Sequence, residues 1–242
     1  MRILVTNDDG DSEGLRMLLE VAGRFGTAYA ITPNRQRSAV SGALTLHKPI
    51  RLHHISDELY SINGTPSDCV LFGLHSGEFG KPDLVLSGIN WGDNTGLGSL
   101  IGSGTVGACW QAALEGVPSI AFSMSRGSGD WRVKESWGDR DLIVKKVAEI
   151  VKKLRPKLGR DRFFNVNMPT AQSLEGAKVV HVRKMQRERY DVSIVMRHDP
   201  DGRPYYWISG PAHPVEKGTD VHEVVVSRNI AVSEVSLSIF DR

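Results

Sequence analysis

Hydrophobic and polar positions follow two alternating patterns over the first two thirds of the chain. Short apolar runs typical of buried parallel strands are followed by segments whose apolar residues recur every three or four positions, as in amphipathic helices. We expect strands at 3–5, 28–32, 59–62, 83–87, 117–123 and 163–166. We expect helices at 14–25, 67–74, 105–114 and 137–154. This alternation predicts an α/β fold with a mostly parallel sheet.

The pattern changes after Pro169. Extended segments then follow one another without intervening helices, at 179–182, 206–208, 224–226 and 230–237. A chain of 242 residues is long enough for one large α/β domain. We therefore predict a core over residues 1–178 and, within the same domain, a β-rich arm with return strands over residues 179–242.

Composition and charge exclude several classes of protein. The formal net charge is +2, which gives no basic field for a nucleic-acid polymer. No apolar stretch reaches 18 residues, so we expect no membrane span. The two cysteines, Cys69 and Cys109, are too few for a disulfide framework, and we expect them to be reduced and buried. The chain starts directly with a strand and lacks a signal peptide, so we expect a cytoplasmic protein.

Two adjacent carboxylates, Asp8 and Asp9, follow the first predicted strand. Ligands of parallel sheets bind beyond the carboxyl ends of the strands. Two carboxylates repel each other there unless a cation lies between them, and hard oxygen ligands favour Mg²⁺, Mn²⁺ or Ca²⁺ over zinc. An Asp-Asp-Gly sequence also suits a turn or a helix cap. This stretch alone therefore leaves a metal site and a turn equally open.

Loops after two further strands carry more oxygen ligands. Ser38 follows the strand at 28–32, and Asn90 and Asn94 follow the strand at 83–87. All three loops open at the same edge of a parallel sheet, where hydroxyl and amide oxygens would complete a hard-cation site. Taken alone, Ser38 is more simply explained by loop hydrogen bonds, and Asn90 has the same alternative.

Ser103, Gly104 and Thr105 open a predicted helix. Hydroxyls and backbone N–H groups at a helix N-terminus can bind a phosphate, although an ordinary helix cap explains the local sequence equally well. Residues 102–107 also match G-x-G-x-x-G, but a long loop precedes them and Glu115 follows too soon for a dinucleotide fingerprint. A dinucleotide oxidoreductase is therefore disfavoured.

The sequence resembles the stationary-phase survival protein SurE family of metal-dependent 5′/3′-nucleotidases. The matching stretches keep their order and spacing over nearly the whole chain, at 2–10, 33–38, 63–70, 83–90, 103–108, 165–169 and 218–220. Each stretch is short, but the combination is highly specific. The resemblance implies a Rossmann-like three-layer core and one divalent cation per subunit, Mg²⁺ or Mn²⁺. It also implies hydrolysis of nucleoside 5′- and 3′-monophosphates to nucleoside and phosphate.

The resemblance also implies roles for individual residues. The metal ligands would be Asp8, Asp9, Ser38 and Asn90. The catalytic residues would be Asp8, Asp9, Ser103 and Thr105. The substrate contacts would be Asn7, Ser38, Asn94, Ser103, Gly104 and Thr105. The chain departs from the family at residues 11–14, a shorter and more acidic loop that could alter the metal or the pocket rim.

In this family the C-terminal arm exchanges between subunits, which implies a homodimer or a tetramer. The chain ends at Arg242, where family members continue into a helix, and this favours the dimer. Two functional alternatives stay open. One is a broader phosphatase or exopolyphosphatase. The other is a non-catalytic Mg²⁺-binding receiver-like module, which would need a phospho-acceptor aspartate where this chain has residues 87–90.

Overall fold

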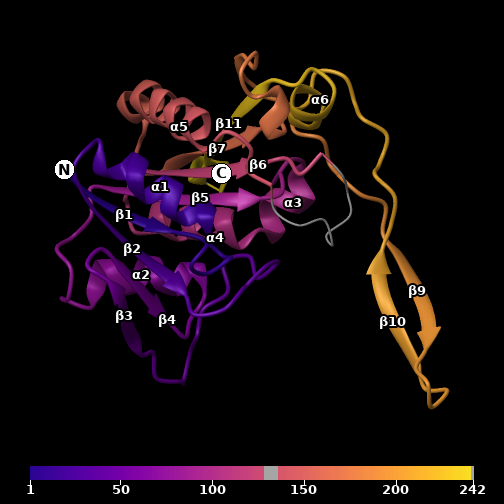
Figure 1. The fold of residues 1–242 in the computed structure, drawn as a ribbon, viewed down its shortest axis with the longest axis horizontal. Helices are drawn as coiled ribbons and strands as arrows, with labels where there is room; N and C mark the ends of the chain where they lie inside the picture. Colours follow the sequence, from indigo (N-terminus) through magenta and orange to yellow (C-terminus); the bar gives the residue numbers. More distant parts are fainter. Residues whose placement is uncertain (128–135, 241–242) are drawn as a thin grey trace.

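The computed structural model describes residues 1–127 and 136–240. Within these residues it forms one nine-stranded sheet and a separate two-stranded hairpin (Figure 1). Across the sheet the strands are β3 (Leu52–Ser56), β4 (Leu59–Ile62), β2 (Thr27–Pro33), β1 (Arg2–Thr6), β5 (Leu84–Trp91), β6 (Ser119–Met124), β7 (Arg162–Met168), β11 (Ile230–Ser236) and β8 (Val179–His181). The strands from β4 to β7 are parallel, while β3 and β11 run antiparallel to their inner neighbours. The α/β fold with a mostly parallel sheet is confirmed.

Helices cover both faces of the sheet. Helices α1 (Glu13–Gly23) and α5 (Arg140–Leu154) pack together on one face, and α2 (Pro66–His75) and α4 (Gly104–Leu114) pack together on the other. Side chains along a strand point alternately to opposite faces. In β1, Ile3 and Val5 are therefore buried in the layer of α1 and α5, whereas Leu4 is buried in the layer of α2.

Side-chain caps fix where the helices begin. Ser12 accepts a hydrogen bond from the Leu15 backbone N–H at the start of α1, and Asp139 does the same for Leu142 in α5. Thr65 and Asp68 form a reciprocal capping box at α2. These caps satisfy backbone donors that a helix N-terminus would otherwise leave unpaired.

The order of the strands reverses between β1 and β5. From β1 the chain moves to β2 and β4 on one side, and it then returns to build β5, β6 and β7 on the other. Neighbouring loops diverge at such a point and leave a crevice at the carboxyl ends of the strands. Asp8 and Asp9 follow β1, Ser38 follows β2, and Asn90 lies near the carboxyl end of β5, so the topology places the predicted metal ligands at this crevice.

Three segments differ from the expected secondary structure, and one of them is strand β9 (Ser193–His198), which the expected extended segments omit. Helix α3 (Leu97–Gly102) lies in the glycine-rich stretch that we expected to be a loop. The prediction of an extended segment at 224–226 was wrong, because Asp220–Val225 forms helix α6. Thr219 caps this helix, and Val221 and Val224 are buried one helical turn apart, a spacing that a run of valines disguises.

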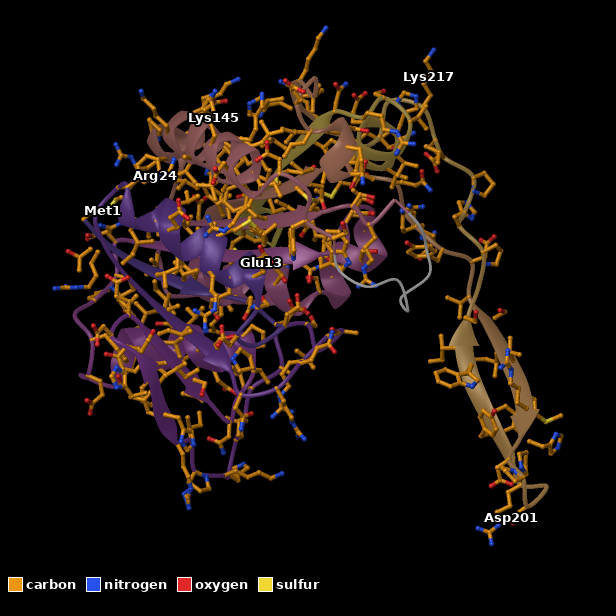
Figure 2. The ribbon with its side chains drawn as sticks, in the orientation of Figure 1. Met1, Glu13, Arg24, Lys145, Asp201 and Lys217 are labelled. Carbon is orange, nitrogen blue, oxygen red and sulfur yellow. The ribbon has the colours of Figure 1, made fainter. Side chains whose placement is uncertain are left out.

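The C-terminal third divides into return strands and a projecting hairpin. Strands β8 and β11 belong to the main sheet, whereas β9 (Ser193–His198) and β10 (Pro204–Ser209) extend away from the body of the molecule (Figures 1 and 2). Every residue of β9 and β10 is exposed. Short 3₁₀ helices lie at Arg155–Lys157, Ala171–Ser173 and Leu237–Phe240. Residues 241 and 242 lie outside the described residues.

The cysteines and the helix lengths bear on two expectations drawn from composition. Cys69 and Cys109 are free and buried, as predicted. In the described part of the chain, no helix has the length and apolar character needed to cross a membrane.

Candidate active site

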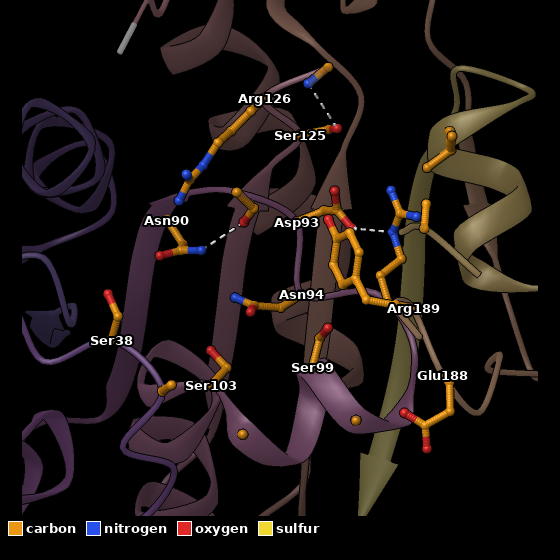
Figure 3. Close-up of a pocket in the computed structure, with 18 of the residues that line it drawn as sticks. Ser38, Asn90, Asp93, Asn94, Ser99, Ser103, Ser125, Arg126, Glu188 and Arg189 are labelled. Carbon is orange, nitrogen blue, oxygen red and sulfur yellow. Dashed lines mark hydrogen bonds and ion pairs between the residues drawn. The ribbon is translucent and has the colours of Figure 1, made fainter. Parts of the chain in front are cut away.

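A cavity of about 850 Å³ opens at the carboxyl ends of β1, β5 and β6 (Figure 3). Six of the residues selected from the sequence line it: Asp8, Asp9, Ser38, Asn90, Asn94 and Ser103. They come from three segments that are far apart in the sequence: the loop after β1, the loop after β2, and residues 90–103, which run from the end of β5 to the start of α4. The predicted convergence of these loops at one edge of the sheet is therefore what the structure shows.

Asp8 is buried at the inner end of the cavity, with 4% of its surface exposed. Its Oδ1 accepts a hydrogen bond of 2.5 Å from the Thr105 hydroxyl, and the carboxylate also accepts the Thr105 backbone N–H. Burial, and secondly the neighbouring Asp9 charge, raise the pKa of Asp8 to about 7, against the lowering effect of the bonds from Thr105. Asp8 is thus a buried carboxylate whose charged form is disfavoured by burial and by the charge of Asp9.

Gly104 lets helix α4 approach Asp8 closely. A Cβ at position 104 would lie 2.9 Å from the Asp8 Cβ and 3.1 Å from both the Asp8 Oδ2 and the Arg37 carbonyl oxygen. Only a residue without a side chain fits there. Gly104 therefore acts through backbone packing, and it does not line the cavity among the described residues.

A β-bulge directs Asn90 into the cavity. Ser87 pairs with Ala121 and Asn90 pairs with Ser123, so two residues of β5 face one residue of β6 between them. Gly88 in this bulge has φ +126°, and a Cβ there would lie 2.2 Å from the Phe122 carbonyl oxygen. The Asn90 amide nitrogen donates to the Gly92 carbonyl at 2.7 Å. The amide oxygen is thereby left available to a ligand.

Ser38 lies on an exposed loop that is tied to both neighbouring elements. The Arg37 backbone N–H donates to the Asp8 carbonyl at 2.7 Å, and the Ser41 N–H donates to the Gly102 carbonyl at 3.0 Å. Ala39 and Ser41 adopt left-handed conformations, with φ of 57° and 52°. The loop is therefore held beside Asp8 by its backbone, and the Ser38 hydroxyl faces the cavity (Figure 3).

Besides Gly104, two predicted substrate contacts, Asn7 and Thr105, do not line the cavity. Asn7 is fully buried, and its amide bonds to the Gly10 carbonyl, to the Ser12 hydroxyl and to Thr32, so it holds the loop in shape. Thr105 is also fully buried and directs its hydroxyl to Asp8. Both residues lie beside the cavity, but their side chains are directed to other protein groups.

Ser103 both caps helix α4 and lines the cavity. Its hydroxyl oxygen accepts the Val106 backbone N–H at 3.2 Å, which leaves the hydroxyl proton available for a ligand. The two alternatives from the sequence, a helix cap and an anion contact, are compatible in this geometry.

The acidic loop at 11–14 stays outside the cavity lining. Asp11 pairs with Arg16 at 2.8 Å, and Ser12 caps α1.

Asn94 is held in place by two asparagines of β7. Its backbone N–H donates to the Asn167 Oδ1 at 2.7 Å, and its carbonyl accepts from the Asn165 Nδ2 at 3.0 Å. Its side-chain nitrogen donates to the Ser123 hydroxyl at 2.8 Å, so the amide oxygen remains available. Asn165 and Asn167 lie two residues apart on one face of β7, which explains the N-x-N pattern there.

Sequence reasoning missed the residues that form the outer part of the cavity. Asp93 and Arg189 make an ion pair of 3.4 Å with side-chain exposures of 7% and 11%, and Arg126 and Tyr190 lie beside it. Burial raises the pKa of Tyr190, with a further contribution from the Asp93 charge. Arg189 and Tyr190 belong to the root of the hairpin, nearly 100 positions after Asp93. The sequence gives no local signal for such a contact.

The oxygen ligands at the inner end suit a divalent cation such as Mg²⁺ or Mn²⁺. Among the described residues there is no cluster of three or more His, Cys, Asp or Glu side chains, so a zinc-type ligand set is absent from them. Two adjacent carboxylates, an amide oxygen and a hydroxyl form the oxygen set that a hard cation prefers, with further positions left for water or substrate. The neighbouring Asp9 charge contributes to the raised pKa of Asp8, and a cation between the two carboxylates would counter that contribution.

Comparison with known proteins assigns the family. The sequence model described as "Survival protein SurE" matches residues 3–191. The chain is 41% identical to a protein named 5′-nucleotidase SurE from Thermofilum pendens, over 98% of this chain and 91% of that protein. It is 38% identical to one of the same name from Geobacter sulfurreducens, over 99% of this chain and 89% of that protein. The crystal structure of the SurE protein from Aquifex aeolicus superposes with a TM-score of 0.77 at 33% identity, covering 98% of this chain and 94% of that one. The chain belongs to the survival protein SurE family.

Proposed function

We propose that this protein is a divalent-metal-dependent phosphomonoesterase that hydrolyses nucleoside monophosphates to nucleoside and phosphate. The observation that carries the proposal is the juxtaposition of Asp8, Asp9, Ser38 and Asn90 in one cavity at the strand-order reversal. The names of the relatives from Thermofilum pendens and Geobacter sulfurreducens support it independently of the geometry.

Asp8, Asp9, Asn90 and Ser38 would hold the cation through oxygen atoms. When bound, a divalent cation supplies Lewis-acid activation of a phosphoryl oxygen and of water. Asp8 is fixed by Thr105 and is nearly inaccessible, so it serves mainly to hold charge. Asp9 is only partly buried and is the carboxylate better placed to orient an attacking water.

The ends of the cavity suit the two parts of a nucleotide. At the inner end, the Ser103 hydroxyl would donate a hydrogen bond to a phosphoryl oxygen, where negative charge develops. Near the middle, the Asn94 amide oxygen would accept a hydrogen bond from a ribose hydroxyl. At the outer end, Tyr190 and the apolar Val192 and Val215 would contact the nucleoside. The volume of about 850 Å³ accommodates a whole nucleoside monophosphate.

We also propose that the protein assembles with a second copy of itself through the hairpin. An isolated two-stranded hairpin is marginally stable in water, and this one exposes a row of large apolar side chains. They are Val192, Ile194, Val195, Met196, Tyr205, Tyr206, Trp207 and Ile208. A homodimer is the simplest assembly that would cover them.

Phosphate release from a panel of substrates tests the proposed reaction. The panel contains 5′- and 3′-nucleoside monophosphates, simple sugar phosphates and short polyphosphate, each assayed with Mn²⁺ or Mg²⁺. We expect release from nucleotides to exceed release from sugar phosphates by at least tenfold in kcat/KM. Equal release from all esters would instead indicate a general phosphatase, and preferred release from polyphosphate an exopolyphosphatase. No release from folded, metal-loaded protein would favour a non-catalytic binding module.

A further inference from the structure

We infer that Arg126 binds the phosphoryl group of the substrate beside Asn90. The inference rests on the proposed function and adds to it a residue that the motifs of the sequence do not identify. Arg126 lies two positions after the end of β6, the strand next to β5, and it lines the cavity. In Figure 3 its guanidinium group points toward Asn90.

Backbone contacts hold the Arg126 side chain in this orientation. Its Nε donates to the Trp91 carbonyl oxygen at 2.7 Å. The guanidinium lies against Gly92, where a Cβ would be 3.1 Å from Nε and 3.3 Å from Nη2. Gly92 has φ +135°, a conformation that favours glycine. Because glycine has no side chain, it leaves room for the guanidinium group at this position. The Nη atoms then remain to donate to a ligand.

The charges in the cavity favour an anion at this position. Asp93 neutralises Arg189, but no carboxylate of the described residues forms an ion pair with Arg126. A divalent cation held by Asp8 and Asp9 would attract the ester from one side, and Arg126 lies on the cavity wall beside Asn90. A phosphomonoester carries nearly two negative charges at neutral pH. The guanidinium group of Arg126 would give the phosphoryl group one further positively charged partner. Its planar shape allows it to donate to two phosphoryl oxygens.

Equilibrium binding of inorganic phosphate, measured by calorimetry on the full chain with Mn²⁺, tests this inference. Arg126→Gln removes the charge, and Arg126→Lys keeps the charge without the two-pronged geometry. Arg16→Gln is the matched control, because it removes an arginine that pairs with Asp11 at the surface. We expect Arg126→Gln to weaken phosphate binding at least tenfold and to lower kcat/KM for a nucleoside monophosphate about 100-fold. We expect Arg126→Lys to lie between it and the wild type.

Binding of the free nucleoside separates phosphate recognition from a structural role. We expect Arg126→Gln to bind adenosine or another product nucleoside as the wild type does, with an unchanged melting temperature. Equal losses of phosphate and nucleoside affinity would show that Arg126 only supports the loop, and would overturn the inference. Unchanged phosphate binding and unchanged kcat/KM would overturn it too, while leaving the proposed reaction intact. If the wild type hydrolyses no nucleotide, the proposed function fails, and the phosphate titration still decides the role of Arg126.

Discussion

The Thr105 hydroxyl donates a hydrogen bond of 2.5 Å to the Asp8 carboxylate, although the two residues are 97 positions apart in the sequence. This bond joins the first turn of α4 to the end of β1. The Thr105 backbone N–H donates to the same carboxylate, so the positive end of the helix is directed at Asp8. Thr105 therefore acts on the proposed cation site through Asp8, as a positioning residue.

Replacing Thr105 with valine should weaken the proposed metal site while the fold persists. Thr105→Val keeps the shape of the side chain but leaves Asp8 without one of its donors. Loss of a residue that orients a metal ligand typically lowers metal affinity or activity by about 10- to 100-fold. Mn²⁺ titration and kcat/KM for a nucleoside monophosphate would measure this. Thr105→Ser retains the hydroxyl and should behave nearly as the wild type. Equal Mn²⁺ affinity in all three proteins would show that the bond does not position Asp8.

Gly104→Ala should damage the site through packing alone. The added methyl group would lie 2.9 Å from the Asp8 Cβ, so either α4 or the β1 loop must shift. Such overpacking lowers the free energy of unfolding by about 1–3 kcal/mol. A displacement of about 1 Å in a catalytic site lowers activity about 100-fold. Gly23→Ala is the matched control, because nothing lies within 4 Å of its added Cβ and it sits at the end of α1. Wild-type kcat/KM in a folded Gly104→Ala protein would refute the close approach.

The stability of the metal-free protein should fall as pH rises toward neutrality. The pKa of Asp8 is raised from 3.8 to about 7 in the folded protein by burial and by Asp9. Between these values the folded state holds a proton that the unfolded state has lost. This contribution to stability is complete below pH 4 and is lost as pH rises through 7. We expect the melting temperature with EDTA to be several degrees higher at pH 5.5 than at pH 8.

Two comparisons test that explanation. Asp8→Asn carries no titrating group at this position, so its melting temperature should change much less between the two pH values. Mn²⁺ supplies positive charge to the ionised carboxylate, so it should raise the melting temperature of the wild type more at pH 8 than at pH 5.5. An identical pH dependence in the wild type and Asp8→Asn would exclude Asp8 as the source.

Charges placed on the hairpin should prevent the proposed assembly. Tyr206 and Ile208 lie two residues apart on β10, with exposures of 62% and 79%, and therefore share one face of the hairpin. The double substitution Tyr206→Lys, Ile208→Lys should convert an oligomer into monomers in light scattering at micromolar concentration. Leu114→Lys is the control, since it places the same charge on an apolar residue that is 67% exposed elsewhere. A monomeric wild type, or an oligomer that survives the double substitution, would contradict the proposal.

The elements that could be predicted from the sequence are those with a clear local pattern of apolar residues. The parallel strands have apolar runs, and the helices α1, α2, α4 and α5 also have side-chain caps. The bounds that the sequence predicts for these elements agree with the structure to within a few residues. Helix α3 was missed, because its Leu97–Gly102 sequence is rich in glycine and offers one buried side chain, Leu100. The sequence predicts an extended segment where α6 lies, since the three consecutive valines at 224–226 satisfy either pattern.

The candidate site could be predicted in part for a similar reason. The strand-to-loop positions of Asp8 and Asn90 are local features, and parallel-sheet topology then brings them together. The orientations of Asn7 and Thr105 depend on partners such as Thr32 and Asp8. The pairing of Arg189 with Asp93 depends on how the hairpin root packs against the sheet. These are tertiary contacts, and no sequence period carries them.

Phosphate release from a nucleoside 5′-monophosphate by the wild type and by Asp8→Asn is the most direct test of the account. Both proteins would be treated with EDTA, supplied with Mn²⁺ or with none, and shown to be folded by circular dichroism. We expect that only the wild type with Mn²⁺ releases phosphate, with at least a 100-fold loss in Asp8→Asn. Equal release by Asp8→Asn, or undiminished release in EDTA, would contradict a divalent-cation site at Asp8 and Asp9.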